Sequence, residues 1–290
     1  MIKPIDYKQG DSKWRTLKYA VDGERSTIKS AGCGVTVMAD IIATLVSPYI
    51  TPITTASWSR MKGYKVKNSG TSYNYFVPQG REYGLTIKRI NTSNIYHQSN
   101  NSLHIKALDE LKNGNWLIAC MGKGHWTSSG HYILVYGYEN GYVYIADPAS
   151  SRADRLKNTW DLLKNEVKYY WSVDMTNRQK VTDGEYRQKD FVRECQYCLG
   201  AGVDEIAGNQ TLSKTITVSA RKNRTHYVVV PIQNKFKKLG LYSGSVDKIF
   251  GSGCTNAVNA YQKNVLHYNK CDGEITSKGK MWKSLLGIKY

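Results

Sequence analysis

The chain has 290 residues, 41% of them hydrophobic, which is enough for two domains that each bury a core. Lys and Arg number 41 against 23 Asp and Glu, so the net charge is +18, and both 1–175 (+8) and 176–290 (+10) are basic. This balance predicts a polyanionic partner: nucleic acid, an anionic membrane surface, or a cell wall that carries acidic polymers. The six cysteines are too few and too scattered for a disulfide framework.

The N-terminal stretch, MIKPIDYKQGD, is polar and lacks the apolar core of a signal peptide. No apolar run approaches the ~20 residues that a membrane-spanning helix needs. We therefore expect a protein that is made in the cytoplasm without a signal peptide and does not insert into a membrane. A target outside the cell would have to be reached by another route.

The stretch from Ser30 to Pro48 predicts a helix that is apolar on nearly every side and therefore lies inside a domain. We expect it to end at Ser47, because proline disfavours the helical conformation in the residue before it. Cys33, between two glycines, would lie at the N-terminus of this helix, where unpaired N–H groups and the helix dipole favour a thiolate. A free cysteine is also commonly a small core residue. Position alone leaves both roles open.

Shorter elements follow along the chain. Helical spacing predicts helices around Ala56–Met61 and Ile105–Leu111, and the apolar run Trp116–Met121 predicts a buried strand. His131–Tyr138 and Tyr142–Asp147 are two strand-like runs joined through Asn-Gly, which predicts a β-hairpin.

His131 opens the first strand of this hairpin and Asp147 closes the second, so both lie at its open end. If Gly137 lies opposite Gly141, His131 pairs directly with Asp147. The commoner two-residue turns would shift this register by up to about three places, and the sequence does not decide between the registers.

A cysteine nucleophile needs a base that works near neutral pH, and the base needs a carboxylate or amide that fixes its tautomer. The order Cys33, His131, Asp147 supplies all three groups. His125, which lies in a glycine-rich loop six residues before His131, is a rival base.

Four short motifs occur in order: Gln9 within YKQGDSKW, AGCG at 31–34, SGHY at 129–132 and ADP at 146–148. Together they resemble the papain-like cysteine peptidases of the bacteriocin-processing type, in their stand-alone cell-wall-hydrolase branch. Val35 stands where such proteins often carry proline. The resemblance covers residues 4–175 and implies an α+β fold for a catalytic domain at 1–175, with a central helix packed on an antiparallel sheet.

The same resemblance implies a role for each candidate residue. Cys33 is the nucleophile, His131 the general base and Asp147 its orienter. Gln9 is an oxyanion-hole donor beside the backbone N–H of Cys33, which suits acyl transfer because donors must be aimed at the developing oxyanion. No metal and no cofactor is expected.

Residues 176–188 are polar with no apolar period and are predicted to form a linker. Within 189–290 the motif VDEIAG (203–208) returns as VDKIFG (246–251), which predicts two related units, about 189–230 and 231–290. Helices are predicted at 190–199, 231–239 and 255–263. In each turn we expect the aspartate to cap, the glycine to adopt the left-handed conformation and the isoleucine to enter the core.

The alternation of these turns with helices, followed by a final W-x-x-L-L helix, resembles the small helical peptidoglycan-binding module of wall-lytic enzymes. The match is good over 231–287, where Lys248 replaces the usual glycine, and partial over 189–215. Ligand contacts are expected from Tyr242, Lys248 and Tyr261. Cys195 and Cys198 have C-x-x-C spacing, but both fall in a helical pattern and no second pair lies nearby, so no metal site is predicted.

These features predict a cell-wall lytic enzyme that cuts a peptide or amide bond of peptidoglycan and is held on the wall by residues 189–290. Its partners would be peptidoglycan and anionic wall polymers. As a phage endolysin it would reach the wall through a separate permeabilising protein; an N-acetylmuramoyl-L-alanine amidase and a bacterial autolysin are the alternatives. A nucleic-acid binder is disfavoured because no recognition motif accompanies the charge. An inactive papain-like domain is disfavoured because every candidate catalytic residue is present.

Overall fold

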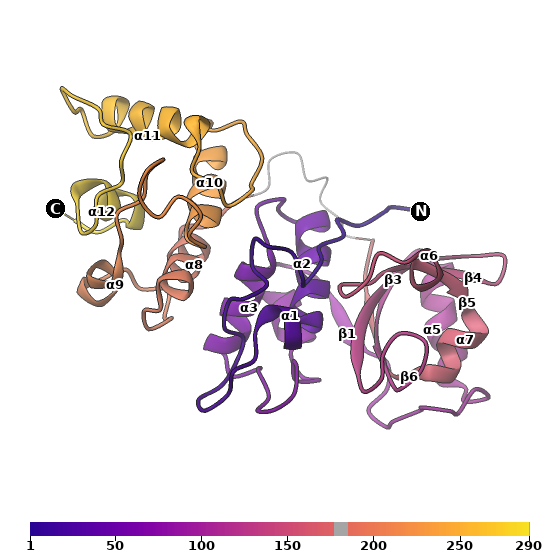
Figure 1. Cartoon of the computed structure of the whole chain (residues 1–290). Coiled ribbons are helices and arrows are strands. Elements are labelled where there is room, and N and C mark those ends of the chain that lie inside the picture. Colours follow the sequence, from indigo (N-terminus) through magenta and orange to yellow (C-terminus); the bar gives the residue numbers. More distant parts are fainter. Residues whose placement is uncertain (177–184, 290) are drawn as a thin grey trace. The chain divides into compact units, whose positions relative to one another are not determined.

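The chain divides into two compact units, Met1–Gly184 and Glu185–Tyr290 (Figure 1). The structure, a computed structural model, describes residues 1–176 and 185–289. The linker predicted at 176–188 therefore lies mostly outside the described residues, and its last residue, Gln188, already belongs to a helix.

A six-stranded antiparallel sheet is the frame of the first unit, with the spatial order β1-β6-β2-β3-β4-β5 (Figure 1). Its central strand β2 is apolar and buried along its whole length, as the sequence predicts. Helices accompany this sheet, so the predicted α+β class is confirmed. The strands are β1 (Ile87–Arg89), β2 (Trp116–Met121), β3 (His131–Glu139), β4 (Tyr142–Ala146), β5 (Lys157–Thr159) and β6 (Val167–Val173).

Helix α2 (Cys33–Leu45) is the predicted central helix, and all of its residues except Cys33 and Thr44 are buried. It lies on the face of the sheet that carries Tyr132, whose ring meets the backbone of Gly34. The opposite face packs under α5 (Leu103–Lys112) and α7 (Trp160–Glu166) around a cluster that includes Ile133. The sheet is thus covered on both faces.

The other helices of this unit are short. The helix predicted at 56–61 forms the C-terminal part of the helix Pro52–Met61. These helices are α1 (Ile28–Ala31), α3 (Pro52–Met61), α4 (Phe76–Glu82) and α6 (Ala153–Leu156).

The β3–β4 hairpin does not adopt the direct register in which Gly137 faces Gly141. A two-residue turn forms instead: Asn140 and Gly141 have φ of 49° and 82°, and Glu139 pairs with Tyr142. Two residues with positive φ give the turn whose twist matches that of the flanking strands, which is why Asn-Gly favours it. A register shift after Val135 then places Val135, rather than Ile133, opposite Ile145. His131 and Asp147 are therefore not direct backbone partners.

The second unit is helical. Helices predicted at 190–199, 231–239 and 255–263 correspond to α8, α10 and α11, and buried apolar residues such as Phe236 and Trp282 form its core. Its helices are α8 (Gln188–Leu199), α9 (Asn209–Lys214), α10 (Val229–Lys238), α11 (Ser252–Asn264) and α12 (Lys280–Leu286).

A buried glutamine organises each turn of the repeat. The amide nitrogen of Gln233 donates to Asp247 Oδ1 (2.7 Å) and to the carbonyl of Ile249, while its amide oxygen accepts the N–H groups of Asp247 and Lys248. Gln196 makes the same four bonds to the turn at 204–206. Gln262 makes them to the turn at 272–274. This set of four bonds, which we call the glutamine clasp, thus occurs three times. The third clasp lies within the second predicted unit.

Two details of this turn differ from the sequence prediction. The left-handed position is the residue after the aspartate, with φ of 67° at Glu205, 67° at Lys248 and 66° at Gly273, and not the later glycine. The isoleucine does not enter the core, since Ile206 is 72% exposed and Ile249 is 41% exposed. Because the glutamine clasp fixes the backbone of that residue, its side chain points outward.

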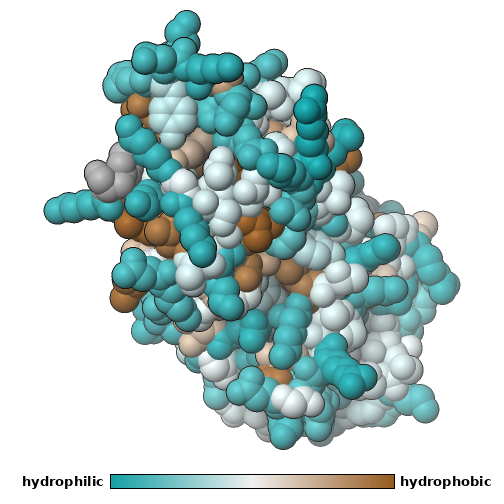
Figure 2. Space-filling view, turned by 60° about the vertical axis from the view of Figure 1, so that its left-hand side comes forward, coloured by the Kyte–Doolittle hydropathy of each residue, from teal (hydrophilic) through white to brown (hydrophobic). Residues whose placement is uncertain are grey.

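In the face shown in Figure 2, long polar side chains dominate and apolar side chains appear in a few small patches. Among the described residues, no helix is long and apolar enough to cross a membrane.

Candidate functional site

Cys33 is the first residue of α2, directly after a break between two helices. Gly32 ends α1 with its N–H bonded to the carbonyl of Ile28. A Cβ at Gly32 would lie 2.4 Å from that same carbonyl oxygen, so only glycine fits there. Among the described residues, no backbone acceptor takes the N–H of Cys33. The break therefore leaves the Cys33 N–H available at a helix N-terminus, where an anion is favoured.

Gly34 explains the other half of the G-C-G motif. A Cβ there would lie 2.9 Å from the side chain of Thr71 and 3.1 Å from the ring of Tyr132. This close approach lets the start of α2 rest directly on strand β3, one residue from His131.

The side chains of His131 and Asp147 meet although their backbones are not paired. His131 Nε2 lies 2.8 Å from Asp147 Oδ1, and both side chains are almost completely buried. An ionised carboxylate accepts, so Nε2 carries the hydrogen and the other ring nitrogen, Nδ1, is left for Cys33. The imidazole and the Cys33 sulfur lie close enough for each to shift the pKa of the other. The three predicted catalytic residues are thus in contact in the order Cys33, His131, Asp147.

The pKa values of this trio are shifted towards charged forms. Burial raises the pKa of the Cys33 thiol, but hydrogen bonding and the positive charge of His131, with the N–H groups of Tyr132 and Gly34, outweigh it and lower the pKa. Burial lowers the pKa of His131, but the hydrogen bonds to Asp147 and Cys33 and their charges raise it to about 9. The arrangement therefore favours a thiolate beside an imidazolium, which is an activated nucleophile.

Arg155, in α6, is a residue of this site that the sequence analysis did not identify. Its Nη2 lies 2.7 Å from Asp147 Oδ2, while Asp147 Oδ1 accepts both His131 and the N–H of Ala149. Burial raises the pKa of Asp147, yet the hydrogen bond and charge of His131, the Ala149 N–H and the charge of Arg155 together lower it. An arginine in a short polar segment carries no sequence signal of its own. Only the fold brings it to the carboxylate.

His125, the rival base, lies outside this trio. Its Nε2 is 3.0 Å from the carbonyl of Asp154, and the Asp154 carboxylate is 3.6 Å away. Its backbone N–H donates to Glu166. His125 is therefore bonded to the segment at 154–166, and the structure places His131 beside Cys33.

Gln9 lies on the N-terminal segment, which is fastened to α2. Tyr7 N–H donates to the buried Asp40 (2.8 Å), and the Gln9 backbone N–H donates to the carbonyl of Pro148, the residue after Asp147. The side-chain amide nitrogen of Gln9 donates to the carbonyl of Lys29, four residues before Cys33. In a continuous helix that carbonyl would accept the Cys33 N–H. Gln9 thus occupies the helix break from which the Cys33 N–H is released.

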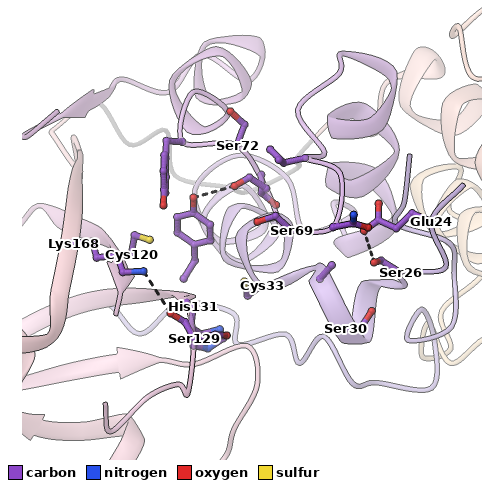
Figure 3. Close-up of a pocket in the computed structure, with 18 of the residues that line it drawn as sticks. Glu24, Ser26, Ser30, Cys33, Ser69, Ser72, Cys120, Ser129, His131 and Lys168 are labelled. Atoms are coloured by element: carbon purple, nitrogen blue, oxygen red, sulfur yellow. Dashed lines mark hydrogen bonds between the residues drawn. The ribbon is translucent and has the colours of Figure 1, made fainter. Parts of the chain in front are cut away.

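A cleft of about 1140 Å³ opens at the trio (Figure 3). The segment at 23–31 and the loop at 66–73 line one side, and Cys120, residues 129–132 and Lys168 line the sheet side, with Cys33 between them.

The predicted wall-binding residues occupy different environments. Tyr242 donates its hydroxyl to the carbonyl of Ser245 and packs beside the Gln233 clasp. Tyr261 is 7% exposed, and its hydroxyl bonds to Ser284. Lys248 is half-buried, with Nζ 4.3 Å from the centroid of the Tyr227 ring, a residue that the sequence analysis did not select.

The described residues contain no group of three or more His, Cys, Asp or Glu side chains placed to hold a metal ion. Cys195 and Cys198 are buried in α8, and burial raises the pKa of both thiols well above the usual value.

Two families match this sequence. Residues 13–179 match the Peptidase_C39 like family, and residues 225–265 match a peptidoglycan binding domain. No curated protein matches the chain.

Two solved structures are similar to parts of the chain. The peptidase domain of Streptococcus ComA, a bifunctional ABC transporter involved in a quorum sensing pathway, is 18% identical, with 49% of this chain and 88% of that chain covered and a TM-score of 0.32. A protein described as a C39-like peptidase from Bacillus anthracis is 10% identical, with 60% and 98% covered and a TM-score of 0.35.

Proposed function

The chain belongs to the Peptidase_C39 like family and carries a peptidoglycan-binding domain, so it is a cell-wall cysteine peptidase, and we propose that Cys33, His131 and Asp147 hydrolyse a peptide bond of peptidoglycan. The observation that carries this proposal is the arrangement of the three residues: His131 is bonded to the Asp147 carboxylate, and its ring interacts with the Cys33 sulfur on the wall of one cleft. The trio opens onto a cleft that exposes the sulfur to a substrate.

The reaction follows from the charges of the trio. The Cys33 thiolate attacks the carbonyl carbon of the scissile bond, and His131 gives its Nδ1 proton to the leaving amine. The resulting thioester is hydrolysed by a water molecule that transfers a proton back to His131 as it attacks. Asp147 keeps Nε2 protonated and the ring in its productive orientation throughout.

The oxyanion of the tetrahedral intermediate needs hydrogen-bond donors. We assign this role to the backbone N–H of Cys33 and to Gln9. An amide nitrogen carries two hydrogens, so the bond from Gln9 to Lys29 leaves one for the oxyanion. Gln9→Glu removes the side-chain amide hydrogens of this residue and should lower kcat by about 100-fold with a small change in KM.

We assign wall binding to the second unit, with Lys248 and Tyr227 as one contact surface and Tyr242 beside it. A positive charge over an aromatic ring suits a wall that presents both sugars and anionic groups. Tyr261 contributes through packing, because its hydroxyl is taken by Ser284. Salt should weaken the attachment, since it screens exposed charges.

The direct test compares the full-length protein with Cys33→Ala on purified cell walls. The variant should bind the walls and release no new amino groups, and lysis by Cys33→Ala would overturn the assignment of the nucleophile. His131→Ala should lose activity in the same way, while His125→Ala, the matched control, should retain it. Equal activity of the two histidine variants would contradict the assignment of the base.

Analysis of the released chain ends then identifies the bond. New peptide termini within the stem or cross-bridge define an endopeptidase, and release of intact stem peptides from the sugar defines the alternative amidase. A source in a phage, with release to the wall through a separate permeabilising protein, is our proposal from the sequence. Addition of the purified protein from outside to intact and to permeabilised cells tests whether it needs such help.

A further inference from the structure

We propose that Lys168 is a specificity-determining residue that binds a carboxylate of the substrate on the leaving-group side of the scissile bond. This inference rests on the proposed function, since it concerns the same cleft. It assigns the substrate as an acidic peptide whose amine-side residue carries a free carboxylate.

The first observation is a β-bulge that brings Lys168 to the cleft. Strand β6 pairs Tyr169 with Cys120 but Val167 with Met121, so Lys168 is an extra residue with no partner on β2. Val167 and Tyr170 both lie in the core under α5 and α7. In a regular strand Lys168 would share the core face with Tyr170. The bulge instead places Lys168 beside Tyr169 on the cleft side, and bulges commonly redirect a side chain next to an active site.

The backbone of this bulge is held firmly. The carbonyl of Lys168 accepts the side-chain amide of Asn91 (2.9 Å) and the N–H of Ile95 (3.3 Å). Asn91 is itself buried and also accepts the N–H of Tyr170. The position of the Lys168 side chain is therefore determined by the fold, although its terminal bonds can rotate.

The second observation is that the ammonium group lacks a carboxylate partner. Among the described residues, its one hydrogen bond is to the carbonyl of Ser129 at 3.5 Å, and no carboxylate lies within ion-pair distance. Lys168 is half-buried on the wall of the cleft. A partly desolvated charge with one weak acceptor retains most of its capacity for a ligand.

The third observation is the charge balance of the cleft. Its one lining carboxylate, Glu24, binds the almost fully buried Lys65 through both oxygens (2.8 and 2.9 Å), so this pair is neutral and fully engaged. Among the described residues, the lining charges that have no ion-pair partner, Arg25 and Lys168, are both positive. Figure 3 shows Lys168 on one side of Cys33 and the loop of Glu24 and Ser26 on the other. The cleft therefore favours an anionic substrate.

The side of the scissile bond follows from His131. This ring protonates the leaving amine, so the amine-side residue of the substrate lies next to it. Lys168 contacts Ser129 and lies 3.9 Å from the position of a Cβ on Gly130, the two residues before His131. Its ammonium group thus faces the leaving group rather than the acyl group.

The test uses the full-length protein and two soluble peptides that span the cleaved bond. They differ only in whether the amine-side residue carries a carboxylate or a carboxamide. The wild-type protein should cleave the acid with about tenfold higher kcat/KM, mainly through KM, as expected for a charge-assisted contact away from the reacting atoms. Lys168→Met should cleave the two peptides equally, and Lys168→Arg should restore most of the preference.

Lys164→Met, which removes a lysine of α7 that pairs with Asp161, is the charge-matched control and should keep the wild-type preference. Equal cleavage of the two peptides by the wild-type protein, or an undiminished preference in Lys168→Met, would overturn the role of Lys168. Failure of the proposed function has a different signature, because the wild-type protein would then cleave neither peptide faster than Cys33→Ala does.

Discussion

Arg155 holds the oxygen of Asp147 that His131 does not use. The guanidinium nitrogen is 2.7 Å from Asp147 Oδ2, and His131 is 2.8 Å from Oδ1, so the carboxylate lies between two cationic groups. The same arginine side chain donates to the carbonyl of Trp126, whose indole N–H donates back to the Arg155 carbonyl (3.0 Å). These contacts fix the fully buried Asp147 carboxylate in place and keep it ionised. The His131 ring requires an ionised acceptor for its Nε2 hydrogen.

Arg155→Met should therefore damage both stability and activity. Removal of one partner of a buried ion pair leaves a charge uncompensated and costs about 3 kcal/mol in the free energy of unfolding. The pKa of Asp147 should rise, so activity should be lost at a higher pH on the acid side than in the wild-type protein. Denaturant unfolding and the pH dependence of kcat/KM measure the two effects. Arg152→Met, which removes a 72% exposed arginine near the same helix, should change neither.

The pH dependence of the wild-type enzyme follows from the raised pKa of His131. Its imidazolium is present below about 9 and is lost above it, so the leaving amine can no longer be protonated and kcat/KM should fall above pH 9. In Cys33→Ala the thiolate that raises this pKa is absent, so the His131 pKa should decrease. NMR titration of the ring in both proteins measures the difference directly. An unchanged pKa would contradict the ion pair.

Gly34→Ala tests the close approach of α2 to the sheet. The added Cβ would lie 2.9 Å from Thr71 and 3.1 Å from the Tyr132 ring, so α2 must move away from β3. We expect a loss of about 1–3 kcal/mol in the free energy of unfolding. Activity should fall further than stability explains, because the shift separates Cys33 from His131. Gly10→Ala is the matched control, since no atom lies within 4 Å of its Cβ and its φ is not positive.

Lys248→Gly should raise the stability of the protein and weaken its binding to walls. Lys248 has φ of 67°, and glycine at the equivalent Gly273 shows which residue suits this conformation best. Relief of the left-handed strain should stabilise the protein by about 1 kcal/mol, while loss of the side chain over Tyr227 should weaken binding to walls. Glu205→Gly, at the third equivalent position, should instead destabilise it, because Glu205 pairs with the buried Arg193. Stronger wall binding by Lys248→Gly would contradict the proposed contact surface.

Local pattern in the sequence determined much of this protein. The mainly apolar run after Cys33 predicts a helix buried on nearly every side, and α2 is that helix. Asn-Gly between two alternating runs predicts the hairpin, and the repeated V-D-x-I-x-G motif predicts turns between helices. Each of these features depends on residues close in sequence, where spacing and backbone preferences are sufficient.

The tertiary structure decided what depends on residues far apart in sequence. The placement of His131 rather than His125 beside Cys33 and the engagement of Asp147 by Arg155 follow from how separate segments pack at one end of the sheet. The bulge that turns Lys168 towards the cleft is a register shift between two strands. The sequence of either strand alone therefore does not predict it. The third glutamine clasp lacks the full V-D-x-I-x-G motif, because apart from the bond to the Asp272 carboxylate its hydrogen bonds go to backbone groups, which every residue supplies. The sequence pattern of Ser30–Pro48 thus predicts the buried helix by itself. The surroundings of Cys33 at the start of this helix depend on contacts between residues far apart in sequence.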